Sequence, residues 1–208
     1  MNDKISTAKV CHFIENGLKD RLIEDMLDLK LLTEGDLQVR AYYHLWNFLK
    51  NDSKSQWRIT NQLHTLGKRG KRNLFPYYPD MILMKGIRKS TSRVAIELKE
   101  NNRVSEKAIR HDEKKLHRLW ERDSPERKRK PLIKMGYLIH IFHGYKRIKE
   151  SEQQQKVENW IASDHKDHIR PIIINAKDHF PSSDLYDEWN SKRHRFTDLL
   201  VGKRFREP

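Results

Sequence analysis

The sequence predicts an α/β fold in which helices flank one mixed sheet. Segments with helical spacing of apolar residues alternate with short apolar runs rich in β-branched and aromatic residues. Between residues 34 and 144 the predicted order is helix, three strands, helix, strand, which is typical of a mixed α/β unit. A chain of 208 residues that is 36% hydrophobic is long and apolar enough for one core. We therefore expect a single domain over 1–208, with a core of about 33–145 and helical additions at both ends.

Two helices are predicted before the first strand. Apolar residues recur at helical intervals from Ser6 to Leu31, which indicates one amphipathic helix, or two that are separated at Gly17, within an N-terminal segment of about 5–31. Thr33 and Asp36 then form a capping pattern at the start of EGDLQVRAYYHLWNFLK. This second helix is expected to end before the turn-like NDSKS.

Three strands are predicted next. QWRITNQLHTL, residues 56–66, alternates weakly between apolar and polar residues, a pattern that a helix would also fit. The clearer strands are 79–85 and 93–99, which the polar GIRKSTS joins. We expect these two strands to form a hairpin.

The second half of the chain alternates helices with strands. SEKAIRHDEKKLHRLWER, residues 105–122, has the apolar spacing of a helix, and MGYLIHIFHG, residues 135–144, is typical of a buried strand. After the polar KESEQQQK, the C-terminal extension of about 150–208 is predicted as a helix around 157–163, the strand IRPIIINA and a final helix that contains Trp189 and Leu200.

The charge of the chain indicates a polyanionic partner. A formal net charge of +14 and a pI near 9.8 favour nucleic acid, although an acidic protein that meets a generic basic surface is an alternative. GKRGKR and ERKRKP are candidate sites of phosphate contact, or else solvated charge runs. The residues predicted to bind nucleic acid are Arg58, Lys68, Arg69, Lys71 and Arg72.

Other features exclude several classes of protein. No apolar run approaches the ~20 residues that span a bilayer, and the first residues lack the apolar segment of a signal peptide, so we expect a cytoplasmic protein that binds no membrane. The single cysteine, Cys11, excludes an intramolecular disulfide. Because the sequence contains no Gly-rich P-loop, we expect no nucleotide cofactor.

Charged residues inside the predicted hairpin need an explanation. Glu97 and Lys99 point to one face of their strand, and Asp80 begins the strand before it. A buried charge is costly unless it is paired or binds a metal. If the hairpin brings Asp80 beside Glu97, two hard oxygen donors and an ammonium group converge, which suits Mg²⁺ and the hydrolysis of a phosphodiester bond.

The residues PD at 79–80 and ELK at 97–99 resemble the PD-(D/E)xK signature of a nuclease superfamily that includes restriction enzymes and Holliday junction resolvases. The resemblance implies a restriction endonuclease-like core, with Asp80 and Glu97 as metal ligands and Lys99 as the catalytic lysine. It also implies the backbone carbonyl of Leu98 as a ligand and Glu34 as an assisting acid. The helix dipole alone would equally explain Glu34. Mg²⁺ is the implied cofactor, and Mn²⁺ is expected to substitute for it.

The function predicted from these residues is metal-dependent endonucleolytic cleavage of DNA, of the restriction type or specific for DNA structure. Resolvase-like members often have a glutamine after the lysine strand, and the helix at 105–122 has none. Because cutting both strands of a duplex needs two sites, a homodimer is expected. The alternative is a nuclease fold that has lost catalysis and binds DNA. RNA as substrate stays open.

Overall fold

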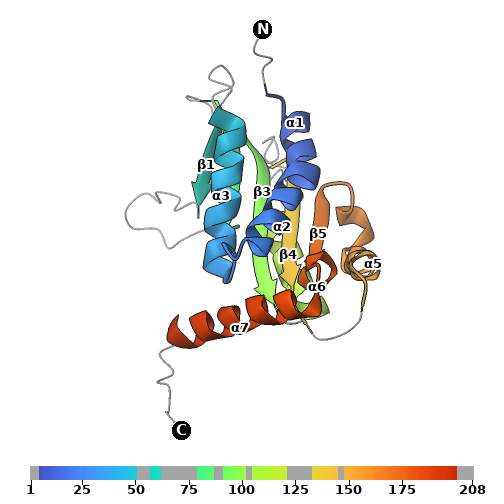
Figure 1. The fold of residues 1–208 in the computed structure, drawn as a ribbon. Helices are drawn as coiled ribbons and strands as arrows, with labels where there is room; N and C mark the ends of the chain where they lie inside the picture. The colour runs from blue at the N-terminus through green and yellow to red at the C-terminus, as the bar shows by residue number, and fades with distance from the viewer. Residues whose placement is uncertain are drawn as a thin grey trace, which may run out of the picture.

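The computed structural model describes residues 5–50, 57–61, 79–86, 91–101, 105–120, 133–144 and 148–200. These residues form one five-stranded mixed sheet with helices on both faces, which confirms the α/β prediction (Figure 1). The strands are β1 (Trp57–Asn61), β2 (Met81–Lys85), β3 (Thr91–Asn101), β4 (Met135–Phe142) and β5 (Ile169–Asn175).

The order of the strands in the sheet follows the sequence. The first three strands pair as an antiparallel meander, and β3, β4 and β5 run parallel to one another. The two parallel connections pass through helices, α4 (Glu106–Trp120) between β3 and β4, and α5 (Glu150–Trp160) between β4 and β5. This is the βαβ arrangement that parallel pairing requires. The predicted order of helix, three strands, helix, strand is confirmed.

Helices cover the two faces of the sheet with separate apolar clusters. One face packs against α1 (Thr7–His12), a π-helical turn (Phe13–Leu18), α2 (Lys19–Leu27) and α3 (Glu34–Lys50). Successive side chains of a strand alternate between faces, so Val94, Ile96 and Leu98 join this first cluster. Ala95 points to the other face, where α4 and α5 supply Leu116 and other apolar residues. Two further helices, α6 (Ala176–His179) and α7 (Ser183–Leu200), follow β5.

The start of α3 and the break at Gly17 follow from local chemistry. The Thr33 hydroxyl accepts a hydrogen bond from the Asp36 amide at 3.1 Å, and the Asp36 carboxylate accepts one from the Thr33 amide at 3.0 Å. This reciprocal cap places the first turn of α3 where the sequence predicted it. Gly17 lies in the π-helical turn, where a Cβ atom would stand 2.7 Å from the Phe13 ring. The N-terminal segment is thus one continuous helical stretch that a single π-helical turn interrupts.

The C-terminal segment corrects one prediction. The helix expected around 157–163 begins earlier, at Glu150, and ends at Trp160. The polar stretch is helical because Glu150 and Glu152 suit the first turn, and glutamine is a good helix former. At Ile161 the backbone is extended. The predicted strand IRPIIINA is β5, which pairs with β4 and forms one edge of the same sheet.

Within the described ranges, no helix combines the length and the apolar character needed to cross a membrane.

Candidate active site

The register of the hairpin brings Asp80 and Glu97 together. Met81 pairs with Ile96 in antiparallel strands, so the preceding Asp80 lies beside Glu97 at the place where β2 begins. The amide of Leu98 donates a hydrogen bond of 2.7 Å to Asp80 Oδ2. This bond ties the first carboxylate to the backbone of the ELK segment. The expected hairpin and the expected neighbourhood of the two acids are both present.

Helix α3 contributes two polar side chains, one turn apart. Glu34 Oε1 lies 3.0 Å from Lys99 Nζ, and Gln38 donates a hydrogen bond of 3.2 Å from Nε2 to Asp80 Oδ1. Both distances depend on the capped start of α3 near the end of β3 (Figure 1). Glu34 therefore contacts the group of residues that the sequence predicted, and it does so through Lys99.

Helix α4 contributes Asp112 and Lys115, which the sequence analysis did not select. Lys115 Nζ lies 3.4 Å from the Glu97 carboxylate and 3.1 Å from Asp112 Oδ1. Asp112 is 2% exposed and lies on the buried side of α4 between Ile109 and Leu116. An acid at an apolar position of a helix is the same anomaly as Glu97 in a buried strand, and it could have been read from the spacing.

His140 completes the buried part of the site. It pairs with Lys99 in the register of β3 and β4, and its Nε2 atom lies 3.9 Å from Asp112 Oδ2. Neither ring nitrogen forms a hydrogen bond with any part of the chain that the structure describes. Burial lowers the pKa of His140 to about 4. At neutral pH the His140 ring is therefore uncharged, and it lies beside Lys99 in the sheet.

The main electrostatic feature of the site is that Glu97 has too little positive charge around it to balance its own negative charge. The residue is 1% exposed, and burial, followed by the charge of Asp80, raises its pKa to about 8. Lys115 opposes the shift without cancelling it, and Asp112 adds to it. Lys115 Nζ donates a hydrogen bond of 3.4 Å to Glu97 Oε2, whereas the buried Oε1 atom receives none from the residues that the structure describes. Such a carboxylate is poised to accept a cation.

The two lysines are held in the charged form. Burial alone would lower the pKa of Lys99, but the hydrogen bond and the charge of Glu34 raise it, with a contribution from Asp80. For Lys115, burial likewise acts against the charge, and Glu97 and Asp112 raise the pKa. Each ammonium group therefore depends on acids that belong to the same site.

The oxygen donors that the hairpin brings together are the carboxylates of Asp80 and Glu97. Across the described part of the chain, no group of three or more His, Cys, Asp or Glu side chains is arranged to hold a metal ion. Asp80 and Glu97 instead offer a pair of carboxylates, and no described residue donates a hydrogen bond to Glu97 Oε1. Two carboxylates with water in the remaining positions are a usual way of binding Mg²⁺, which keeps several of its waters.

Of the five residues predicted to bind nucleic acid, the structure describes Arg58 alone. Arg58 is exposed on β1. Lys68, Arg69, Lys71, Arg72 and the run at 126–131 lie outside the described residues.

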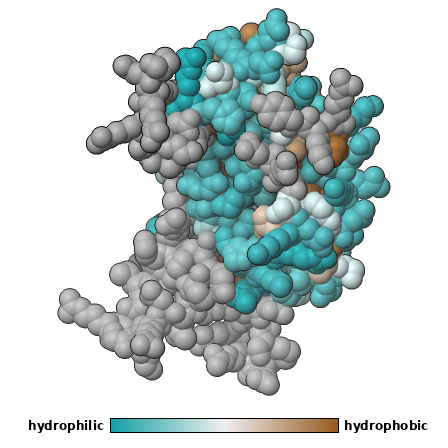
Figure 2. Space-filling view, turned by 90° about the horizontal axis from the view of Figure 1, so that it is seen from below, coloured by the Kyte–Doolittle hydropathy of each residue, from teal (hydrophilic) through white to brown (hydrophobic). Residues whose placement is uncertain are grey.

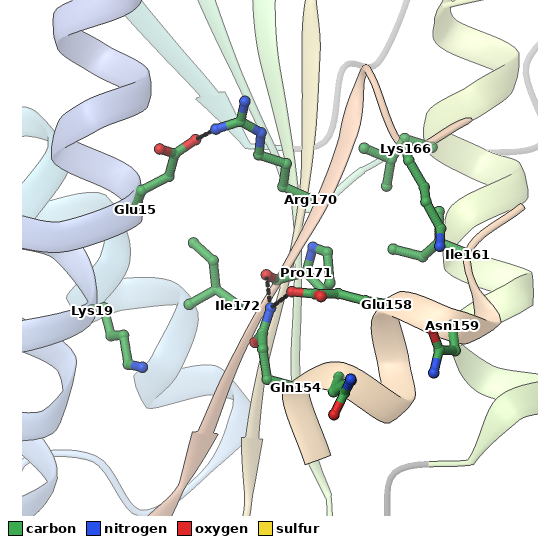
Figure 3. Close-up of a pocket in the computed structure, with 12 residues that line it drawn as sticks. Glu15, Lys19, Gln154, Glu158, Asn159, Ile161, Lys166, Arg170, Pro171 and Ile172 are labelled. Atoms are coloured by element: carbon green, nitrogen blue, oxygen red, sulfur yellow. Dashed lines mark hydrogen bonds and ion pairs between the residues drawn. The ribbon is translucent and has the colours of Figure 1, made fainter. Parts of the chain in front are cut away.

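A hollow of about 550 Å³ lies away from Asp80 and Glu97, between the N-terminal helices, α5 and β5 (Figure 3). Glu15 pairs there with Arg170. The Gln154 side chain donates a hydrogen bond of 2.8 Å to the Pro171 carbonyl and accepts one of 2.9 Å from the Ile173 amide. These contacts are internal to the fold, because Gln154 satisfies the outer edge of β5. The side chains that line this hollow therefore stabilise the edge of the sheet, and their arrangement does not resemble that of Asp80 and Glu97.

Comparison with protein-family models, with curated proteins and with solved structures finds no match to this chain. The nuclease resemblance therefore depends on the residues of the site themselves.

Proposed function

We propose that this chain is a metal-dependent deoxyribonuclease of the PD-(D/E)xK type, with a restriction endonuclease-like core. The observation that carries the proposal is that Asp80 lies beside a buried Glu97. Lys99, two residues after Glu97, lies on the same face of β3. The hairpin, the flanking helices and the basic composition agree with it. Fold analogy alone would be insufficient, since folds are shared by unrelated activities.

In this proposal Asp80 and Glu97 hold Mg²⁺, or Mn²⁺ in its place, together with the carbonyl of Leu98. The ion supplies a lowered pKa for a bound water and neutralises charge on the phosphate. Asp80 is fixed for its role by the Leu98 amide and by Gln38, each of which occupies one carboxylate oxygen. Ligands that are oriented in advance lose little freedom on binding.

Lys99 supplies the positive charge beside the scissile phosphate. Its ammonium group is positioned by Glu34 at 3.0 Å and stays protonated at neutral pH because neighbouring acids raise its pKa. In that state it can donate a hydrogen bond to the attacking water or to a phosphate oxygen on which negative charge develops. A lysine held in this way acts by orientation and charge and does not act as a base.

The test is a cleavage assay on supercoiled plasmid, linear duplex and a four-way junction, with Mg²⁺, Mn²⁺ or EDTA. We expect metal-dependent cutting that falls by at least about a thousandfold in Asp80→Asn and in Lys99→Ala. Asp184→Asn and Lys149→Ala are matched controls at exposed positions and should cut like the parent. Cutting that persists in EDTA, or in both site variants, would refute the proposal.

One observation favours a second candidate, a DNA-binding protein without catalysis. Lys115 already lies 3.4 Å from the Glu97 carboxylate and 3.1 Å from Asp112 and offsets part of their charge from within the chain, as an internal cation can in a site that no longer binds metal. This candidate predicts binding to duplex DNA that metal does not alter, no cutting of any substrate, and no thermal stabilisation by Mg²⁺ or Mn²⁺.

The type of nuclease is decided by the products. A restriction-type enzyme yields discrete fragments of plasmid DNA, whereas a structure-specific enzyme cuts the four-way junction regardless of sequence. Concerted cutting of both strands requires two sites, which a homodimer supplies. Analytical ultracentrifugation with and without DNA tests this, and a monomer under both conditions would refute the homodimer.

A further inference from the structure

A basic groove of about 810 Å³ leads away from the candidate active site along α4. One side is the end of β3, with Lys99 and Asn101, and the other is the first half of α4. The described surface seen from below the ribbon view, the end at which β3 finishes, is predominantly hydrophilic (Figure 2). The cationic and imidazole side chains that line the groove are Lys99, Lys107, Arg110, His111, Lys114 and Lys115.

The exposed lysine, arginine and histidine side chains of α4 form a stripe. Lys107, His111 and Lys114 are separated by three or four residues, as is Arg110 from Lys107 and Lys114, so they follow one side of the helix. All four are exposed. Asp112 is the one acid that lines the groove within the described residues, and it is buried against Lys115. The stripe therefore presents positive charge to the groove.

Two members of the stripe have their charge available. Arg110 forms an ion pair with Glu106 at 2.8 Å. By contrast, Lys107 and Lys114 form no ion pair with any residue that the structure describes. Between these two lysines the helix rises about 10 Å, the axial length over which one DNA strand carries roughly three phosphates. Their spacing thus matches two phosphates of a single backbone that lie about three nucleotides apart.

We propose that this groove binds the phosphodiester backbone of a DNA strand and directs it to Lys99, with Lys107 and Lys114 as phosphate contacts. The inference rests on the proposed nuclease function for its end point, since the groove is continuous with the lysine of that site. It locates the DNA path on α4, on residues that the charge runs in the sequence did not indicate. Contacts of this kind hold a strand in register and read no bases.

The experiment measures binding of a fluorescent duplex in EDTA, where no cutting occurs, over 50 to 200 mM salt. The parent is compared with Lys107→Gln/Lys114→Gln. Each lost phosphate contact should reduce the slope of log K against log salt by about 0.9, so the double variant should lose about 2 in slope and roughly tenfold or more in affinity. Lys107→Arg/Lys114→Arg should retain both.

The matched control is Lys134→Gln/Lys166→Gln, which removes the same charge. Both lysines are exposed and lie just before β4 and β5, at the end of the sheet away from Asn101. This control should change the slope by less than about half as much as the groove variant. Circular dichroism and thermal melts confirm that both variants are folded.

Each result decides the question. A groove variant that binds like the parent, or a control that loses as much as the groove variant, overturns the groove, because net charge alone would then explain binding. Polyglutamate that competes with DNA on equal terms at 150 mM salt also overturns it. Groove-dependent binding without cutting on any substrate overturns the nuclease and leaves the groove intact. Metal-dependent cutting, together with a groove variant that binds DNA like the parent, overturns the groove and leaves the nuclease intact.

Discussion

Glu97 and Glu150 are two glutamates that are largely withdrawn from water and have opposite electrostatic surroundings. Glu150 receives Lys19 Nζ at 2.6 Å, His179 Nε2 at 2.7 Å and the Asn175 amide at 2.9 Å. Burial would raise its pKa, but His179 and Lys19 lower it to about 2. Glu97 has Lys115 on one side and two other acids nearby, and its pKa rises to about 8.

The difference teaches that partners, and not burial alone, decide what a buried carboxylate does in this fold. Burial opposes the charge at both positions. Glu150 joins α2, α5 and α6 through saturated contacts, which is typical of a structural group. Glu97 is left short of positive charge in the place where a cation would have a function. Four substitutions break or sharpen this contrast.

The largest effect is expected from Lys115→Met. The substitution removes the ammonium group that neighbours both Glu97 and Asp112 and leaves two buried acids without compensation. We expect a loss of about 3 kcal/mol in the free energy of unfolding in EDTA, with a part restored by Mg²⁺. Urea unfolding measures it, and Lys114→Met, at the exposed neighbouring position, is the control. A variant as stable as the parent would show that Glu97 and Asp112 need no internal cation.

Glu150→Gln should lower stability at neutral pH by about 3 kcal/mol, the equivalent of a pKa that falls from 4.5 to about 2. Because the pKa is depressed in the folded state, this contribution is complete above the ordinary pKa of glutamate and disappears as the pH falls toward 2. The parent and the variant should therefore converge in acid. Thermal melts from pH 7 to pH 2.5 test this, beside Glu152→Gln on the same helix. Curves that stay parallel in acid would contradict the ionic origin.

Glu97→Gln should act in the opposite direction and raise stability in EDTA by about 1 to 2 kcal/mol at pH 7.5. The folded-state pKa is raised, so Glu97 costs stability as the pH rises from 4.5 toward about 8, while the unfolded chain ionises freely. The gain should shrink toward pH 4.5. Melting temperatures over this range measure it, with the exposed Glu188→Gln as control. In the same variant, stabilisation by Mg²⁺ should disappear; a variant destabilised at all pH values would mean that Glu97 is structural.

The smallest effect is expected from Gln38→Leu, which removes the donor to Asp80 Oδ1. Stability should change by less than about 1 kcal/mol, since Gln38 is only partly buried. Cleavage should fall roughly tenfold, through weaker orientation of the carboxylate. Cleavage rates at several Mg²⁺ concentrations separate metal affinity from turnover, and the exposed Gln155→Leu serves as control. An unchanged rate would remove Gln38 from the site.

Local features of the sequence were sufficient for most of the elements. The cap at Thr33 and Asp36 placed the start of α3 at Glu34, and the apolar runs located β2, β3, β4 and β5. The weak alternation around Trp57 proved to be a strand. The sequence misplaced α5, because its apolar face is marked by little more than Val157 and the helix is formed mainly by polar residues.

The candidate site was predicted in part. Asp80, Glu97 and Lys99 stand in two neighbouring strands, so pairing of a hairpin was enough to bring them together. Gln38 and Glu34 reach them across more than 40 positions, and Asp112, Lys115 and His140 enter from α4 and β4. The groove was missed because Lys107 and Lys114 resemble any other lysines of an exposed helix.

By itself, the sequence determined the alternation of helices and strands, the basic character of the surface and the unusual acids within an apolar hairpin, because these depend on spacing and composition. Only the tertiary structure decided which charges meet. The packing of α3 and α4 around the end of β3 gives Lys99 its partner in Glu34 and leaves Glu97 with too little positive charge. Electrostatic interactions act across space, and their strength is set by burial and distance that no local pattern of residues specifies.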